Sequence, residues 1–191
     1  MANHKLKFFV LTGEPGVGKT TLTKKLSSTI ADKGIKLSGF YTEEIRKDGV
    51  REGFDIVTVD GVRGRLARDQ TLLSAPIKQK VGKYGVLVKE FETIAMPCLV
   101  KSEDSTPQVL VIDEIGKMEF QSETFKAAIK IIFNHPSHYT VLATIPLKKG
   151  DQLIESIRNN KNAKVWMVTR KNRDTIHEEI LKVMNTALRF D

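Results

Sequence analysis

The residues best suited to chemistry form a glycine-rich run near the amino terminus that ends in lysine and threonine: Gly13, Glu14, Pro15, Gly16, Val17, Gly18, Lys19 and Thr20. Glycine permits backbone conformations that a Cβ forbids, so successive N–H groups can converge on one anion. This spacing is that of a P-loop, and it predicts that Lys19 reaches the β- and γ-phosphates while the Thr20 hydroxyl ligates Mg²⁺. We include the next residue, Thr21, among the predicted nucleotide-binding residues.

A second candidate group is the pair of acids, Asp113 and Glu114, that follows the apolar segment 109–112. In the Walker B pattern, the first acid holds the hydration shell of Mg²⁺, so Asp113 is predicted to act opposite Thr20. A carboxylate one position further on can take a proton from an attacking water, which makes Glu114 the predicted general base. The alternative is an exposed acidic pair at a strand end. The intact P-loop upstream favours the metal and base assignments.

The residues after these acids leave more than one interpretation open. Lys117 could reach the γ-phosphate or neutralise Glu114, and it could equally pair with Glu119 at the surface. Gly116 is included among the nucleotide-binding residues, and Arg173 is predicted to touch phosphate or to stack on a base. Earlier in the chain, the β-rich stretch over about residues 40–68 carries five arginines, one of which could act as an arginine finger within the chain: Arg46, Arg51, Arg63, Arg65 and Arg68.

The elements that position these residues can be read from the apolar pattern. Residues 8–11 predict a buried strand before the loop, and Leu22, Leu26 and Ile30 recur at helical spacing after it. Two Asp-Gly pairs, at 48–49 and 60–61, predict two hairpins and hence an antiparallel meander over about residues 40–68. A short strand near 84–88 and a helix over 90–96, ending before Pro97, are expected next.

The second half of the chain alternates apolar strands with amphipathic helices. Strands are predicted at 109–112, 141–144 and 165–168, with Asp151 and Asn172 as caps of the helices that follow the last two. Alternation of this kind predicts an α/β fold, with three α/β/α layers and a doubly wound, mainly parallel sheet. We expect one P-loop NTPase domain over 1–191, with the β-meander inserted at about 40–88. The ligand is expected at the carboxyl ends of the strands.

Composition limits the class of protein further. The 191 residues are 40% hydrophobic, enough for a sizeable core, and no apolar run is long enough to cross a membrane. The lone Cys98 fits a reducing compartment, and residues 1–7 lead into the first strand without a signal peptide, so we expect a cytoplasmic protein, with the nucleus as the alternative. The net charge of +8 attracts nucleotides and nucleic acid alike, but no RNA-binding signature accompanies it, so nucleic acid is not an expected partner.

Beyond these motifs, the chain resembles the family of small P-loop nucleoside-triphosphatases that includes the cancer-related nucleoside-triphosphatase. The resemblance runs in order over roughly residues 8–180, and it rests on the P-loop together with these segments: 39–44, 53–55, 63–64, 81–84, 113–119, 144–146, 169 and 172–173. It implies a P-loop fold with an additional strand. It also implies Mg²⁺-dependent hydrolysis of ATP, GTP and the other nucleoside triphosphates, CTP and UTP, to the diphosphate and phosphate, with little discrimination among bases.

Two other functions remain open from the residues alone. A small-molecule or nucleotide kinase would share the loop, the metal site and the sheet, and the meander could then hold the acceptor. Glu114 favours hydrolysis, because it places a water-activating carboxylate where a kinase must exclude water. A nucleotide-gated switch that binds nucleic acid or protein is the third alternative. Asn160, Lys161 and Asn162 are followed by Ala163, so the guanine-reading Asn-Lys-x-Asp element is missing there. We expect a monomer.

Overall fold

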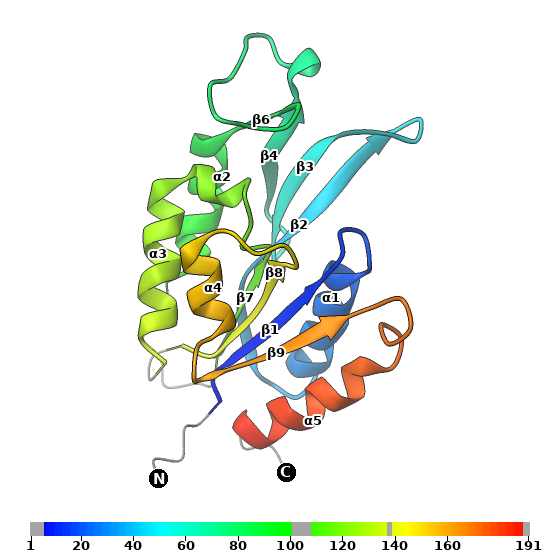
Figure 1. Ribbon diagram of the computed structural model, residues 1–191, viewed down its shortest axis with the longest axis vertical. Coiled ribbons are helices and arrows are strands. Elements are labelled where there is room, and N and C mark those ends of the chain that lie inside the picture. Colours follow the sequence, from blue (N-terminus) through cyan, green and yellow to red (C-terminus); the bar gives the residue numbers. More distant parts are fainter. Residues whose placement is uncertain (1–5, 101–107, 137–138, 189–191) are drawn as a thin grey trace.

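The computed structural model describes residues 6–100, 108–136 and 139–188. Within them, nine strands form one sheet in the order β5-β6-β4-β3-β2-β7-β8-β1-β9 (Figure 1). The strands are β1 (Phe8–Gly13), β2 (Lys36–Lys47), β3 (Val50–Thr58), β4 (Arg63–Asp69), β5 (Lys80–Val81), β6 (Tyr84–Val86), β7 (Gln108–Asp113), β8 (Val141–Pro146) and β9 (Ala163–Val168). The helices are α1 (Lys19–Ala31), α2 (Val88–Cys98), α3 (Glu123–Asn134), α4 (Gln152–Arg158) and α5 (Ile176–Leu188), with 3₁₀ turns η1 (Gln70–Leu72) and η2 (Glu119–Gln121).

The parallel half of the sheet confirms the predicted α/β class. Strand β1 pairs in parallel with β8 and β9, and β7 pairs in parallel with β8 and with the first half of β2. The carboxyl ends of these strands therefore share one edge of the sheet, where the loop after β1 and the acids after β7 both lie.

Helices cover both faces of this parallel half, and the alternation within β1 shows why. Phe8 and Val10 join the apolar cluster under α2, α3 and α4, whereas Phe9 and Leu11 join the one under α1 and α5. Successive side chains of a strand point to opposite faces, so a strand apolar at every position must be covered twice. Figure 1 shows α1 and α5 on one side of the sheet and the other three helices on the opposite side.

Strand β2 joins the parallel half to the predicted antiparallel meander. Its residues 36–41 pair in parallel with β7, and residues 40–47 pair antiparallel with β3, which in turn pairs with β4. The hairpin at Asp48 and Gly49 has positive φ at both residues, 50° and 79°, as a tight two-residue turn requires. The meander thus extends the same sheet.

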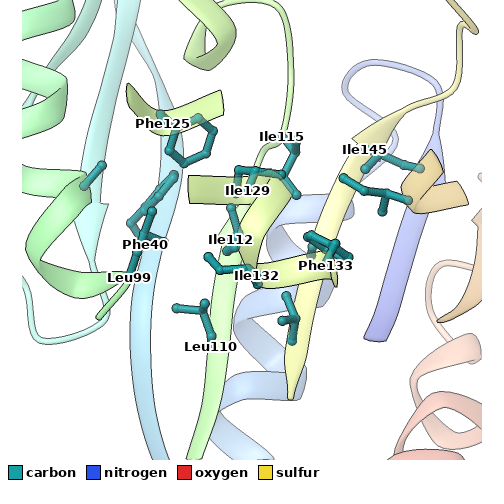
Figure 2. Packing of buried hydrophobic residues seen from close by; sticks show 14 of the residues in the cluster. Phe40, Leu99, Leu110, Ile112, Ile115, Phe125, Ile129, Ile132, Phe133 and Ile145 are labelled. Atoms are coloured by element: carbon teal, nitrogen blue, oxygen red, sulfur yellow. The ribbon is translucent and has the colours of Figure 1, made fainter. Parts of the chain in front are cut away.

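The larger apolar cluster continues under the meander. Figure 2 shows Phe40 of β2 and Phe125 of α3 reaching into one packed layer with Ile112 of β7. The rings of Phe40, Phe91 and Phe125 meet pairwise at 5.2–5.9 Å between centroids. These contacts hold α2 and α3 against the sheet beneath the end of β7, and so fix the strand that carries Asp113.

Two predicted helix boundaries are wrong. Helix α2 runs through Pro97 to Cys98, because a proline in the last turn costs only one backbone hydrogen bond and α2 ends directly after it. Asn172 is not a helix cap: its side chain accepts from Thr169 N–H and donates to the carbonyl of Met167. It therefore ties together the turn after β9, and α5 begins only at Ile176.

None of the helices in the described part of the chain is long and apolar enough to cross a membrane.

Candidate active site

The glycine-rich loop connects the end of β1 to the start of α1. Gly13 lies against the turn after β9, where an added Cβ would sit 2.4 Å from the carbonyl oxygen of Val168. Gly18 precedes α1 with a φ of 109°, in the left-handed region that a side chain disfavours. These two positions require glycine for different reasons, close approach and backbone conformation. Glu14, Pro15 and Gly16 are exposed between them, so the loop opens to solvent at the amino end of α1.

Lys19 is folded back over this loop. Only 8% of the residue is exposed, and its Nζ donates to the carbonyl oxygens of Gly13 at 3.1 Å and Glu14 at 3.3 Å. The ammonium is therefore held at the mouth of the loop, at the positive end of the α1 dipole. Both groups attract the same anion.

Asp113 ends β7 and is 1% exposed. One carboxylate oxygen, Oδ1, accepts from the Thr144 hydroxyl at 2.5 Å, while Oδ2 is buried and has no hydrogen-bond partner among the described residues. Burial raises the pKa of Asp113, and the hydroxyls of Thr144 and Thr20, followed by the Lys19 ammonium, oppose that rise. A buried carboxylate oxygen without a partner is expensive, which indicates that it serves a ligand.

The donor set at this carboxylate suits Mg²⁺. The part of the chain that the structure describes holds no group of three or more His, Cys, Asp or Glu side chains that could enclose a metal ion. Mg²⁺ bound with a triphosphate needs no such cage, since phosphate oxygens and waters supply most of its ligands. The Thr20 hydroxyl and the free oxygen of Asp113 are of the right kind for the remaining two positions.

Glu114 directly follows Asp113 and is partly buried. Burial raises the pKa of its carboxyl group, the Lys19 ammonium lowers it, and the charge of Asp113 raises it again. A carboxyl group whose pKa is moved upward in a phosphate-binding site is a better proton acceptor than an ordinary surface glutamate. The predicted base thus follows Asp113, the predicted metal ligand, and interacts electrostatically with Lys19 of the loop.

The segment after Glu114 resolves one of the open alternatives. Lys117 is exposed, whereas Glu119 is 4% exposed and its Oε2 accepts from the backbone N–H of Gly116 at 3.1 Å. A surface pair between Lys117 and Glu119 is therefore wrong. Gly116 lies between two carboxylates, because an added Cβ there would sit 3.1 Å from Oε1 of Glu114 and 3.0 Å from Oε2 of Glu119.

The arginine candidates divide by position. Arg173 lies at the loop itself, since a Cβ at Gly18 would come within 3.8 Å of its Cδ. Each arginine on the meander is paired with a carboxylate: Arg46 and Arg51 with Glu44, Arg63 with Glu43 and Asp55, Arg65 with Glu90, and Arg68 with Asp55. Arg63 is the one linked to α1, because Glu43 also pairs with Lys24.

Aromatic rings that could stack on a base are used in packing. Trp166 is 4% exposed, lies 6.3 Å from the Phe9 ring in a stacked arrangement and donates from Nε1 to Glu179 at 2.8 Å. Tyr84 packs edge-on against Phe54 at 5.5 Å.

Sequence reasoning missed two residues that hold the site together. Thr144 supports Asp113 from the adjacent strand β8. Arg158 of α4 donates to the Thr12 hydroxyl at 3.4 Å and to the Pro146 carbonyl at 2.7 Å, so it joins the strand before the loop to the end of β8. Thr144 could have been found from the sequence, because it is a polar residue in an otherwise apolar strand. Nothing in the sequence distinguishes Arg158, a single arginine at the end of a short helix, from a surface residue.

A glycine-rich loop between the first strand and helix, with a buried acid at the end of a parallel strand facing it, defines this chain as a P-loop NTPase. The chain belongs to the NTPase family, which matches residues 8–181. Among its relatives is the cancer-related nucleoside-triphosphatase of Homo sapiens, 43% identical over 184 residues that cover 93% of this chain and 96% of that protein.

Bacterial proteins are similar to the same extent. The nucleoside-triphosphatase THEP1 of Thermotoga petrophila is 43% identical over 92% of this chain and 91% of its own length. The crystal structure of THEP1 from the hyperthermophile Aquifex aeolicus aligns with a TM-score of 0.78 and 37% identity, covering 92% of this chain and 98% of that one. The predicted fold and family are thereby confirmed, and the chain is an enzyme of the nucleoside-triphosphate hydrolase class.

Proposed function

We propose that this protein is a Mg²⁺-dependent nucleoside-triphosphatase that converts ATP, GTP, CTP and UTP to the diphosphate and phosphate with low base selectivity. The observation that carries the proposal is the position of the Glu114 carboxyl group. This group directly follows Asp113, the proposed metal ligand; burial raises its pKa, and the charge of Lys19 opposes that rise. The names of the relatives, nucleoside-triphosphatases, support the same reaction.

In the proposed reaction, water attacks the γ-phosphorus while the Glu114 carboxylate takes one of its protons. The bond between the γ-phosphorus and the bridging oxygen breaks, and its electron pair leaves with the diphosphate. The Gly13–Thr20 loop and Lys19 hold the phosphate chain, with Gly116, Thr21 and Arg173 assigned to the nucleotide. Mg²⁺, when bound at Thr20 and Asp113, neutralises charge on the phosphates.

Low base selectivity follows from where the recognition groups lie. The loop amides, Lys19 and Asp113 all address phosphate and metal, and the two candidate stacking rings, Tyr84 and Trp166, are packed in the fold. A site that depended on one base's hydrogen bonds could reject another by about 10⁴-fold. We expect kcat/KM for ATP and GTP to agree within roughly tenfold. A thousandfold preference for one base would contradict the proposal.

The decisive experiment compares the wild type with Glu114→Gln. The amide keeps the shape but cannot accept a proton, so hydrolysis should fall by about 10²–10⁴-fold while nucleotide binding is retained. Glu123→Gln, which changes an exposed glutamate at the start of α3, is the matched control and should leave the rate unchanged. Phosphate release is measured for the four triphosphates with Mg²⁺, with binding followed separately by calorimetry.

The same assay separates the alternative reactions. A kinase would form the diphosphate only when an acceptor is added, and full activity in Glu114→Gln would favour that reading. Loss of binding in step with loss of rate would instead make Glu114 a structural residue.

A further inference from the structure

Glu119 is a buried acid that the proposed reaction does not use. It begins the 3₁₀ turn η2, is 4% exposed, and its Oε2 accepts from the N–H of Gly116 at 3.1 Å. The backbone closes the same turn, because Phe120 N–H donates to the carbonyl oxygen of Gly116 at 3.0 Å. A buried carboxyl is costly compared with an apolar side chain of similar size, so its presence in this turn calls for a role.

The position of Glu119 links it to Glu114. Gly116 separates the two side chains, and the site of its missing Cβ lies 3.1 Å from Oε1 of Glu114 and 3.0 Å from Oε2 of Glu119. A side chain at residue 116 would push one carboxyl group aside. The two acids are therefore neighbours across one residue of backbone, and the hydrogen bond to Glu119 fixes that backbone.

The charges around Glu119 favour its neutral form. Burial and then the charge of Glu114 raise the pKa of Glu119 to about 8, and Asp113 of β7 acts in the same direction. Two carboxylates side by side in a poorly hydrated place cannot both ionise freely.

The charged side chains that the two helices packed against η2 bring near it have partners other than Glu119. Glu92 of α2 accepts from the Ser122 hydroxyl at 2.5 Å. Lys126 of α3 lies 5.0 Å from the centre of the Phe120 ring and pairs with Asp151 at 2.9 Å. The N–H of Gly116 favours the ionised form of Glu119, but burial and the acidic neighbours outweigh it, so the carboxyl keeps its proton at neutral pH.

We propose that Glu119 is a positioning residue for Glu114: as a neutral carboxyl it holds the Gly116 turn and thereby the Glu114 carboxylate, and its ionisation opposes that arrangement. The inference rests on the proposed function, in which Glu114 is the base. It predicts that loss of the Glu119 proton lowers the rate, because a second negative charge then lies beside Glu114.

The experiment measures kcat and KM for ATP hydrolysis with saturating Mg²⁺ from about pH 6 to about pH 10. In the wild type, kcat should decline above pH 8, by up to about tenfold per pH unit for a single ionisation. Glu119→Gln cannot ionise but still offers an oxygen to Gly116 N–H, so it should keep kcat within about threefold at neutral pH and lose the alkaline decline. Glu123→Gln, the exposed control, should keep the wild-type profile.

Glu119→Asp provides a second variant. It keeps an ionisable carboxyl but withdraws it from Gly116 by one methylene, so kcat should drop by about 10- to 100-fold with KM unchanged. The inference is overturned if Glu119→Gln keeps the alkaline decline, or if either variant changes KM alone.

Thermal unfolding supplies a readout that does not depend on activity. A carboxyl whose pKa rises from 4.5 in the unfolded chain to about 8 in the fold stabilises the folded state at low pH. That stabilisation is lost as pH rises between these two values. The melting temperature of Glu119→Gln minus that of the wild type should therefore increase as the pH rises from about 5 to about 8, because only the wild type loses this stabilisation. A constant difference would show that Glu119 ionises normally and would overturn the inference.

The outcomes separate the two proposals. If Glu114→Gln is fully active, the assignment of the base fails, whatever Glu119 does. If Glu114→Gln is inactive and Glu119→Gln keeps the wild-type pH profile, only the role of Glu119 fails.

Discussion

At the scale of single residues, the site depends on one buried carboxylate whose two oxygens have different partners. Asp113 Oδ1 is held by the Thr144 hydroxyl, and this bond leaves Oδ2 as the free oxygen of a fixed group. A hydrogen bond to a charged acceptor is worth about 1.5–3 kcal/mol. We therefore propose that Thr144 orients Asp113, the predicted metal ligand, and is not itself a ligand, in the way that outer hydrogen-bond partners orient the ligands of metal sites.

Replacing Thr144 by valine removes this support at nearly constant volume. The Mg²⁺ concentration for half-maximal hydrolysis should rise by about tenfold, which corresponds to about 1.4 kcal/mol of lost orientation. Titration of the rate with Mg²⁺ measures this shift. Thr140→Val changes a threonine directly before β8, at the end of the strand away from Asp113 and 8% exposed, and should leave the titration curve in place. An unchanged curve for Thr144→Val would mean that Asp113 holds its position alone.

The sequence was a good guide to residues whose role is encoded in a contiguous motif. The loop could be predicted because its residues are contiguous, and Asp113 because it directly follows the apolar segment 109–112. The roles of Thr144 and Arg158 could not, since each acts on a partner from a different part of the fold. A surface pair of Glu119 with Lys117 was one of the alternatives left open, because nothing in residues 113–119 shows which acid turns inward.

At the scale of elements, the short helix α4 supports the loop from behind. Asp151 caps it by accepting from the N–H groups of Leu153 and Ile154 at 2.8 and 3.3 Å, as predicted. The last residue of α4, Arg158, donates to the hydroxyl of Thr12, the residue before Gly13. The cap therefore stabilises a helix whose far end contacts the strand that carries the loop.

Asp151→Ala should lower the free energy of unfolding by about 0.5–2 kcal/mol, the usual cost of removing a helix cap. Its salt bridge with Lys126 is partly exposed and adds little. Urea denaturation followed by circular dichroism gives the difference. Asp174→Ala removes a side chain that is 86% exposed and should change stability by less than about 0.5 kcal/mol. Equal stability of both variants would contradict the role of the cap.

Element types were predictable and their order in the sheet was not. Apolar periodicity located the strands and the helices, and two Asp-Gly pairs located both hairpins. No local signal showed that β2 pairs with β7 in its first half and with β3 in its second, because that choice depends on which apolar faces meet. The boundary at Pro97 was misjudged because a proline in the last turn of a helix removes very little.

At the scale of the whole molecule, the sheet is continuous from the short edge strand β5 to β9. The larger apolar cluster also spans both halves, with Leu66 and Val86 of the meander and Ile112 and Ile145 of the parallel half among its members. A shared core and a shared strand, β2, couple the two halves energetically. We therefore propose that the chain folds as one domain, with the meander as an insertion that cannot separate from it.

One domain predicts one unfolding transition. Circular dichroism and amide hydrogen exchange of β3 and β4 should report the same midpoint in urea, since the meander has no core of its own to retain. Exchange at β3 and β4 that is complete well below the global midpoint would contradict the single-domain proposal. Added Mg²⁺ and a non-hydrolysable triphosphate should move the midpoint upward for both probes together.

Trp166 is the one tryptophan in the sequence, and it lies on β9 in contact with Phe9 of β1 and with Glu179 of α5. Its fluorescence therefore comes from a single known position in the fold. When the indole is excited selectively, its fluorescence emission shifts to longer wavelength once water reaches the ring. This shift reports the separation of α5 and β9 from β1, the strand that leads into the phosphate loop. Each stability comparison above can thus be made on the unlabelled protein, at concentrations too low for self-association to intervene.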